Sequence, residues 1–216
     1  MTAIAKPPVL ALDGPGGSGK GTVGQILAHR LDWHFLDSGA LYRAVGVAAE
    51  REKINLDDQP ALARLATSMN IRFIPRTDGS AAAVFLNGQD IGNMLRTEES
   101  GRLASIVAAL PEVRRSLLQK QHSLRLPPGL VADGRDMGST VFPDAILKVF
   151  LTASPEIRAQ RRHKQLIDKG FDVNLPRLLD EIRERDARDA GRAVSPLRPA
   201  EDACILDTSQ LDISGV

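Results

Sequence analysis

Short apolar runs and helical repeats alternate along this chain. Residues 9–12 form an uninterrupted apolar run before Asp13 and a glycine cluster, as expected for a strand buried on both faces of a parallel sheet. From 20 to 31 the apolar residues recur at helical spacing, and 33–36 is the next apolar run. A strand, a helix and a second strand in this order predict right-handed βαβ units.

Three later apolar runs have the same character. They cover residues 130–132, 145–151 and 203–206, and polar or glycine-rich residues follow each of them. Open parallel sheets bind ligands beyond the carboxyl ends of their strands, so we expect a binding site at that edge. Between the runs at 33–36 and 130–132, helices are predicted at 98–109 and 111–124.

A segment of different character interrupts this α/β pattern. Residues 71–74 and 83–86 are typical of strands, and Asn87-Gly88 favours a two-residue hairpin turn. We therefore expect a small antiparallel insertion at 68–96, carried on a core that is formed by residues 1–67 and 97–216.

A glycine-rich loop connects the first predicted strand to the first predicted helix. Its residues, called the phosphate-binding loop below, are Gly14, Pro15, Gly16, Gly17, Ser18, Gly19, Lys20, Gly21 and Thr22. Glycines let successive N–H groups point at one centre, and the helix start adds further donors and partial positive charge. We expect this loop to bind ATP, with Lys20 reaching the β- and γ-phosphates.

The residue after Lys20 departs from the simple nucleotide-binding pattern. That pattern has Ser or Thr there as a Mg²⁺ ligand, whereas this chain has Gly21. A Mg²⁺ site that acts through water is the better expectation, because Mg²⁺ keeps several waters beside phosphate oxygens. Asp37 and Asp133 follow predicted strands and could hold those waters, although either could instead cap a helix or a turn.

Composition narrows the class of protein. The 216 residues include 28 Lys and Arg against 27 Asp and Glu, a net charge of +1 that gives no reason to expect nucleic acid as a partner. No apolar run approaches the ~20 residues of a membrane helix, so no membrane partner is expected. Cys204 is the only cysteine, which fits a reducing cytoplasm, and we expect it to pack in the core with Trp33 and Phe35.

Arginine dominates the basic residues, with 21 Arg against 7 Lys. Arginine offers a planar fork to phosphate and stays charged in almost any environment. A phosphate-binding loop by itself fits kinases, GTPases, motor ATPases and non-catalytic sensors. The chain lacks an Asn-Lys-x-Asp run for reading guanine, which weakens the GTPase interpretation.

Three further motifs make a resemblance specific. They are residues 37–43 (Asp-Ser-Gly-Ala-Leu-Tyr-Arg), residues 133–138 (Asp-Gly-Arg-Asp-Met-Gly) and the spacing Arg185-Asp186-x-x-Asp189-x-x-Arg192. With the Gly-Lys-Gly-Thr loop ending, the chain resembles the bacterial cytidylate kinases over nearly its whole length. The resemblance implies a P-loop NTPase-type α/β fold with three layers, a mostly parallel central sheet, a monophosphate-binding insertion and a helical lid.

The resemblance also implies the reaction and its residues. ATP would transfer its γ-phosphoryl group to CMP or dCMP, giving ADP and CDP or dCDP. By match to the family's motifs, the monophosphate would be held by Ser38, Arg43 and Arg135. Cytosine would be read by Ser105, Arg114 and Asp136, and the ribose and phosphate side by Arg185, Asp189 and Arg192. Lys20, Arg135, Arg161 and Arg162 would be catalytic, with Mg²⁺ as cofactor, in a protein expected to be a monomer.

The chemistry of the residues agrees with this implication but leaves alternatives. A phosphate acceptor is already anionic near pH 7, so it needs no general base, whereas a metabolite alcohol would. Asp136 can accept from the cytosine amino group and Arg114 can donate to ring acceptors. Arg43, Arg114 and the 185–192 stretch could each be ordinary solvated charges, and Asp136 could cap a helix.

A lid is expected at about 157–172, where basic residues on a helix would close over ATP and exclude water. Arg158, Arg161, Arg162, Lys164 and Lys169 would face the nucleotide, while the other face packs through apolar residues. The rival interpretations are a kinase of UMP, AMP or an alcohol, and an RNA-binding module. The 158–198 stretch argues against RNA, because its 9 Arg and 2 Lys oppose 7 acidic residues.

Overall fold

A five-stranded parallel sheet forms the centre of the computed structural model, which describes residues 6–74, 82–168 and 170–216. The strands lie in the order β2-β6-β1-β7-β8. Their bounds are β1 Val9–Asp13, β2 His34–Asp37, β6 Leu130–Gly134, β7 Leu147–Thr152 and β8 Cys204–Asp207. Since all neighbouring pairs are parallel, every strand ends at the same edge of the sheet.

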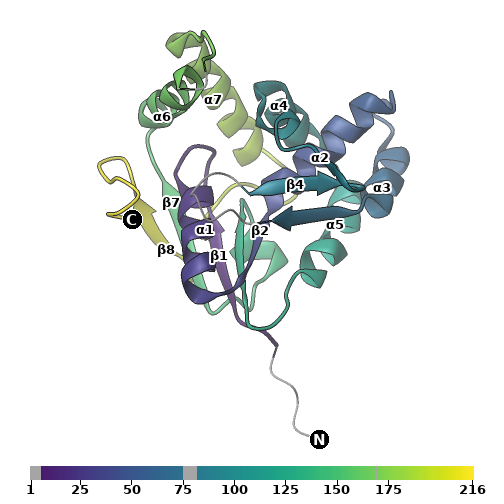
Figure 1. Cartoon of the computed structure of the whole chain (residues 1–216), viewed down its shortest axis with the longest axis horizontal. Coiled ribbons are helices and arrows are strands. Elements are labelled where there is room, and N and C mark those ends of the chain that lie inside the picture. The colour runs from purple at the N-terminus through teal and green to yellow at the C-terminus, as the bar shows by residue number, and fades with distance from the viewer. Residues whose placement is uncertain (1–5, 75–81, 169) are drawn as a thin grey trace, which may run out of the picture.

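Helices cover both faces of this sheet (Figure 1). They are α1 Lys20–Leu31, α2 Ser38–Arg51, α3 Gln59–Ser68, α4 Glu98–Val107, α5 Pro111–Ser123, α6 Pro155–Ile167 and α7 Leu175–Ala190. Two short turns are η1 Met94–Arg96 and the π-helical η2 Met137–Val141. Side chains alternate along β1, so that Val9 and Ala11 pack with α2 to α5, whereas Leu12 packs with α1. This confirms the predicted three-layer α/β fold.

A separate three-stranded sheet contains β3 Ile71–Ile74, β4 Ala83–Leu86 and β5 Gln89–Asp90. All its pairs are antiparallel, with Ile71 opposite Leu86. The predicted turn joins β4 to β5, where Asn87 and Gly88 have φ values of 49° and 87°, the left-handed geometry of a tight hairpin. Val84 and Leu86 attach this sheet to the core. Residues 75–81 of the predicted insertion lie outside the described residues.

The expectation that Cys204 packs in the core is wrong. Cys204 is exposed, and its neighbour Ile205 is 62% exposed. The physical reason is the position of β8 at the edge of the sheet, where it pairs with β7 alone and both residues keep contact with solvent. Phe35 is buried as expected, whereas Trp33 is half-buried. None of the helices in the described ranges has the length and apolar composition needed to cross a bilayer.

Candidate active site

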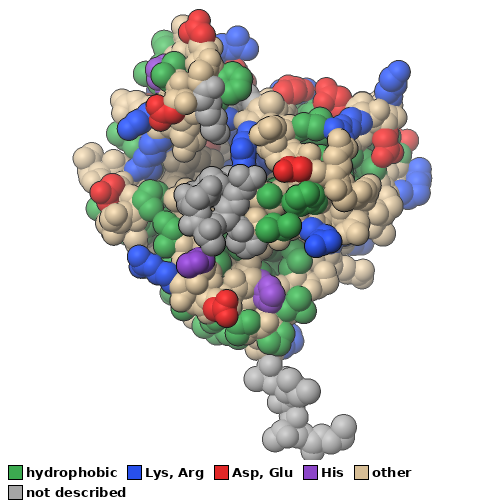
Figure 2. Space-filling view, viewed as in Figure 1, with side chains coloured by type: hydrophobic (Ala, Val, Ile, Leu, Met, Phe, Trp, Pro, Cys, Tyr) green, Lys and Arg blue, Asp and Glu red, His purple; other side chains and the backbone are tan. Residues whose placement is uncertain are grey.

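A cleft of about 790 Å³ opens at the carboxyl edge of the parallel sheet, and we call it the main cleft. It lies between the phosphate-binding loop and the lobe formed by α6 and α7, and Figure 2 shows Lys and Arg side chains beside the hollow below this lobe. Its basic lining residues are Lys20, Arg43, Arg96, Arg135, Arg158, Arg161, Arg162, Lys164 and Arg185. The edge of the sheet where the site is predicted therefore carries a cavity, and its nine basic residues outnumber six acidic ones.

The phosphate-binding loop takes the conformation that its glycines permit. Gly14 has φ 143°, and a Cβ placed there would lie 2.0 Å from the carbonyl oxygen of Leu151 on the neighbouring strand. Gly19 is left-handed at φ 95° and precedes α1, which has no side-chain cap. The first N–H groups of α1 are thus available to an anion. The Ser18 hydroxyl, buried in this loop, has no hydrogen-bond partner among the described residues.

Lys20 lies buried at the centre of the loop. Its Nζ donates to the carbonyl oxygen of Pro15 at 2.9 Å and is 3.9 Å from Oδ1 of Asp133. Burial lowers the pKa of Lys20, and the positive charge of Arg135 lowers it further, while Asp133 opposes both effects. A polyphosphate in this cradle would favour the charged form of Lys20, because opposite charges favour the ionised form.

Asp37 and Asp133, the two carboxylates predicted to bind the water molecules of a Mg²⁺ ion, differ in their surroundings. Asp37 caps α2 by accepting from the Ala40 N–H at 2.8 Å, and its other oxygen accepts from Arg43 at 3.0 Å. Asp133 is buried, and burial raises its pKa despite the nearby ammonium of Lys20. A Cβ on Gly21 would lie 3.1 Å from Oδ2 of Asp133, so the missing side chain leaves this carboxylate open toward the loop.

A second pocket of only about 30 Å³ adjoins the main cleft and shares Gly39, Arg135 and Arg185 with it; we call it the inner pocket. At its wall, Arg114 from α5 forms a buried ion pair with Asp136, which precedes η2. The Arg114 guanidinium also lies over the Tyr42 ring, with 5.7 Å between the guanidinium carbon and the ring centre. Both Arg114 and Asp136 are residues that the family resemblance predicts, and the fold pairs them although they lie 22 residues apart.

A network of charges forms the other wall of the inner pocket. Asp189 of α7 accepts from Ser105 of α4 at 2.9 Å and from Nε of Arg135 at 3.2 Å, and it forms an ion pair with Arg192. Burial alone would raise the pKa of Asp189, but the guanidiniums around it, Arg135 first, hold the pKa below its usual value. The carboxylate therefore stays ionised and keeps the arginines in place.

The remaining predicted acceptor residues lie around the junction of the two cavities. Ser38 is buried, and its hydroxyl donates to the side-chain oxygen of Gln121 on α5 at 2.8 Å. Nε of Arg43 is buried without a hydrogen-bond partner among the described residues. Arg185 lines both cavities. The orphaned Nε of Arg43 fits an absent anionic ligand, because buried donors are normally paired.

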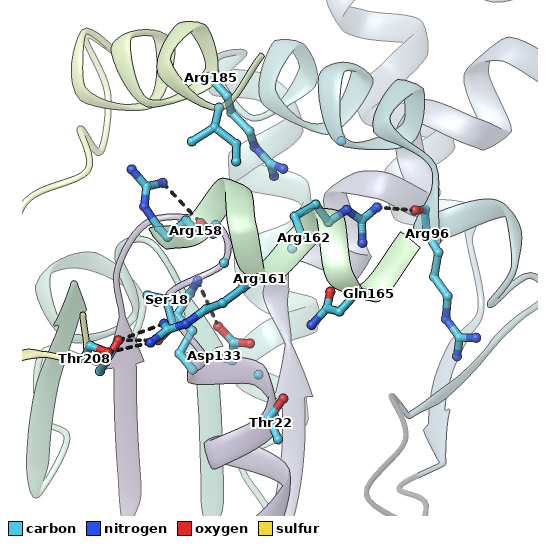
Figure 3. A pocket seen from close by; sticks show the side chains of 18 of the residues that line it. Ser18, Thr22, Arg96, Asp133, Arg158, Arg161, Arg162, Gln165, Arg185 and Thr208 are labelled. Carbon is cyan, nitrogen blue, oxygen red and sulfur yellow. Dashed lines mark hydrogen bonds and ion pairs between the residues drawn. The ribbon is translucent and has the colours of Figure 1, made fainter. Parts of the chain in front are cut away.

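Helix α6 brings its arginines to the main cleft in different directions (Figure 3). Arg161 donates to the Thr208 hydroxyl at 3.1 Å and to the carbonyl oxygen of Leu211, also at 3.1 Å. Arg162 points the opposite way and donates to the carbonyl oxygen of Arg96 at 2.7 Å. The predicted lid residues Arg161 and Arg162 thus line the cleft. Lys169 lies outside the described residues.

Arg158, expected to face the nucleotide with these two, also lines the main cleft, but protein partners hold its guanidinium. It is 3% exposed and forms an ion pair with Asp186 of α7. Its Nη1 donates to the carbonyl oxygen of Gly16 at 3.2 Å, and its Nε donates to Ala153 at 2.9 Å. The hydrogen bond to Gly16 ties Arg158 to the phosphate-binding loop, and the ion pair and carbonyl contacts compensate the burial of its guanidinium.

Sequence reasoning overlooked three buried side chains at this site: Asp13, Gln121 and Thr208. Asp13 accepts from two backbone N–H groups of η2, at Met137 and Gly138. Thr208 donates to the carbonyl oxygen of Ser18 at 3.0 Å. Asp13 ends the central strand β1 and Thr208 directly follows β8, and a polar residue at a strand end is the signal that identified Asp37 and Asp133, so both could have been found. No pattern in the sequence singles out Gln121.

The site places a lysine inside an anion-binding loop and arginines opposite it, an arrangement that suits the transfer of a phosphoryl group between two anions. On this fold, such a site defines the class of P-loop kinases. The chain belongs to the cytidylate kinase family, whose model, described as cytidylate kinase, matches residues 10–216. The cytidylate kinase of Aeromonas salmonicida (strain A449) is 54% identical over 97% of this chain and 90% of its own length. That of Pseudomonas paraeruginosa (strain DSM 24068 / PA7) is 53% identical over 98% and 93%.

One solved structure has a lower sequence identity to this chain. TT1252 from Thermus thermophilus has a TM-score of 0.46 and 21% identity, covering 98% of this chain and 94% of its own.

Proposed function

We propose that this protein transfers the γ-phosphoryl group of ATP to CMP or dCMP, giving ADP and CDP or dCDP. Membership of the cytidylate kinase family supports the reaction. The observation that carries the choice of base is the buried pair of Arg114 and Asp136 at the inner pocket. A carboxylate accepts from the amino group of cytosine, and a guanidinium donates to its ring acceptors. Uracil, with an oxygen in place of the amino group, would leave Asp136 facing an acceptor.

On the donor side, the ATP phosphates would lie in the phosphate-binding loop. The open N–H groups at the start of α1, the unpartnered Ser18 hydroxyl and the ammonium of Lys20 support this assignment. Arg161 and Arg162 would stabilise the transferring group from α6, after exchanging their backbone partners for phosphate oxygens. The α6 helix would also exclude water and so limit hydrolysis of ATP.

On the acceptor side, Arg43 and Arg135 would hold the monophosphate, because both line the main cleft beside the inner pocket. Ser38 would join them only after its hydroxyl turns away from Gln121. Ser105 would complete the base site with Arg114 and Asp136. Contacts to the ribose and phosphate would come from the network of Arg185, Asp189 and Arg192.

No general base is required in this proposal. The acceptor oxygen is anionic near neutral pH, so the enzyme has to bring two mutually repelling phosphates together in line and neutralise their charge. The arginines supply most of this neutralisation at fixed positions. Bound Mg²⁺ would neutralise further phosphate charge. Asp133, open toward Gly21, suits a water-mediated Mg²⁺ site better than Asp37, whose oxygens already bind Ala40 and Arg43.

The wider organisation belongs to the same proposal. Residues 68–96 would be the monophosphate-binding insertion on a core of 1–67 and 97–216, with a lid at about 157–172; β3, β4 and β5 support the insertion. We further infer a monomer, and a cytoplasmic location in keeping with the single cysteine and the nucleotide substrates.

A panel of nucleoside monophosphates tests the proposal. With ATP and Mg²⁺, ADP formation should be fastest with CMP or dCMP and at least about a hundredfold slower in kcat/KM with UMP, AMP or GMP. The coupled assay should be repeated without acceptor to measure hydrolysis of ATP alone. Equal rates with CMP and UMP would contradict the assignment of Arg114 and Asp136 to the base.

A further inference from the structure

Asp13 is a buried carboxylate that the proposed reaction does not use. It is the last residue of β1, directly before the phosphate-binding loop, and it is 5% exposed. Its Oδ1 accepts from the N–H of Met137 at 2.7 Å, and its Oδ2 accepts from the N–H of Gly138 at 2.8 Å. One side chain on β1 therefore fixes two consecutive peptide groups that are more than a hundred residues away in sequence.

The segment held by Asp13 is also enclosed on its other sides. Met137 is fully buried, and a Cβ placed on Gly134 would lie 2.7 Å from its Cγ. A Cβ on Gly138 would lie 3.0 Å from the stem of Lys148, whose ammonium is anchored to Asp202 at 2.9 Å. Because a packed wall lies opposite the carboxylate, the backbone of this segment has little room to move.

Arg135 and Asp136, which directly precede Met137 and Gly138, are the residues proposed to contact the acceptor nucleotide. Asp136 pairs with Arg114 at the inner pocket, and Arg135 donates to Asp189 at 3.2 Å. A shift of the backbone at Met137 would move the Cα of Asp136 with it, since adjacent Cα atoms are joined by a rigid peptide. The hydrogen bonds of Asp13 thus reach the two peptide groups that directly follow Asp136 in the chain.

We propose that Asp13 is a positioning residue for the acceptor nucleotide, holding the 135–138 segment so that Asp136 and Arg135 meet the base and the monophosphate beside the phosphate-binding loop. The proposal rests on the proposed function above. It separates the two substrates, because the side chain of Asp13 binds the acceptor segment, whereas the path of the phosphate-binding loop follows from the β1 backbone, which pairs with β6 and β7.

The conservative variant Asp13→Asn tests this role. An amide has one acceptor oxygen where the carboxylate has two, so one of the two buried N–H groups would face an NH₂ group and lose its partner. We expect the KM for CMP to rise about tenfold while the KM for ATP changes less than about twofold, and the CMP-to-UMP ratio of kcat/KM to fall about fivefold. Asp58→Asn, which weakens a carboxylate-to-backbone contact at the start of α3, is the matched control and should change none of these values.

The alternative is a purely structural role for Asp13. Equal rises in both KM values, or a loss of kcat that only follows the folded fraction, would overturn the proposal. Hydrogen exchange of the backbone amides in the wild-type protein provides a test that does not depend on the folding of the variant. Protection of the Met137 and Gly138 amides in the free enzyme would support the proposal, and exchange at the rate of an open loop would refute it. If wild-type enzyme itself fails to prefer CMP, the proposed function is at fault rather than the role of Asp13.

Discussion

The main cleft and the inner pocket are built in opposite ways. The phosphate-binding loop of the main cleft offers mostly backbone groups from one continuous segment, and the cleft measures about 790 Å³. The inner pocket is formed by side chains from α2, α4, α5, α7 and the end of β6, and it measures about 30 Å³. Its polar groups already bind one another, so a base would have to replace those contacts.

This difference separates general from specific recognition. Backbone N–H groups bind any polyphosphate, because every nucleotide carries the same phosphate chain. Paired side chains in a small pocket can reject a ligand that leaves one of them unpaired, since an unpaired buried polar group has a large free-energy cost. We therefore expect changes in the main cleft to reduce catalysis with all acceptors, and changes in the inner pocket to alter the choice among them.

The largest effect is expected from Lys20→Ala in the main cleft. Removing the ammonium from the cradle should lower kcat by about a thousandfold with every acceptor, because the charge of the transferring group loses its nearest stabilising partner. Steady-state ADP formation with CMP and UMP measures this loss. Lys6→Ala, at an exposed lysine near Asp144, is the control and should retain wild-type kinetics. A loss of kcat with CMP alone would contradict the distinction between a main cleft that serves all acceptors and an inner pocket that selects among them.

Asp136→Asn should have the next largest effect, and mainly on selectivity. The amide can donate to the oxygen that uracil carries in place of the cytosine amino group, so discrimination should narrow by about ten- to a hundredfold. The measurement is the ratio of kcat/KM for CMP to that for UMP. Asp144→Asn, which weakens a surface pair with Arg125, serves as the control. An unchanged ratio would mean that Asp136 does not read the base.

A smaller effect is expected from Ser105→Ala. Asp189 loses one hydrogen bond but keeps Arg135 and Arg192, so the KM for CMP should rise about fivefold with the KM for ATP unchanged. Ser123→Ala removes a comparable hydroxyl on the surface of α5 and provides the control. A similar rise in the KM for ATP would indicate that the two cavities are coupled through α4.

The smallest effect concerns stability rather than turnover. Burial raises the pKa of Asp13 to about 6 from 3.8, with Asp136 raising it and Lys20 and the two N–H groups lowering it. The folded protein therefore binds a proton that the unfolded chain releases, and stability is lost as pH rises through this range. Lowering the pH from about 6 to about 4.5 should therefore raise the free energy of unfolding more in the wild type than in Asp13→Asn, and Asp133, whose pKa burial also raises to about 6, should act in the same direction in both proteins.

Denaturant unfolding at several pH values measures this dependence. Asp13→Asn should flatten the slope, because its side chain does not titrate. Asp189 at the inner pocket should have the opposite effect: its pKa is held below its usual value, so its contribution to stability is present at neutral pH and is lost as the pH falls through that lowered pKa. An equal pH dependence of the unfolding free energy in wild type and Asp13→Asn between about 4.5 and 6 would contradict the assignment to Asp13.

The same contrast explains what the sequence could predict. The three-layer fold and the phosphate-binding loop follow from local patterns: apolar runs, helical spacing and glycines in one continuous stretch. The pair of Arg114 and Asp136 has no local signature, and a family resemblance was needed to separate Arg114 from its neighbour Arg115. Periodicity could not detect that β8 lies at an edge, so Cys204 was placed in the core. Nor does a basic helix reveal which arginine, here Arg158, points inward.

The hydrogen bond between Arg162 and the main chain of residue 96 determines which substitutions this part of the protein tolerates. Its acceptor is a main-chain oxygen, which every amino acid supplies. A codon change at position 96 would therefore leave this link between α6 and the η1 turn in place, as long as the chain keeps its path. Loss of the guanidinium at position 162 would remove the link outright. The two ends of one hydrogen bond thus differ sharply in how much mutation they tolerate.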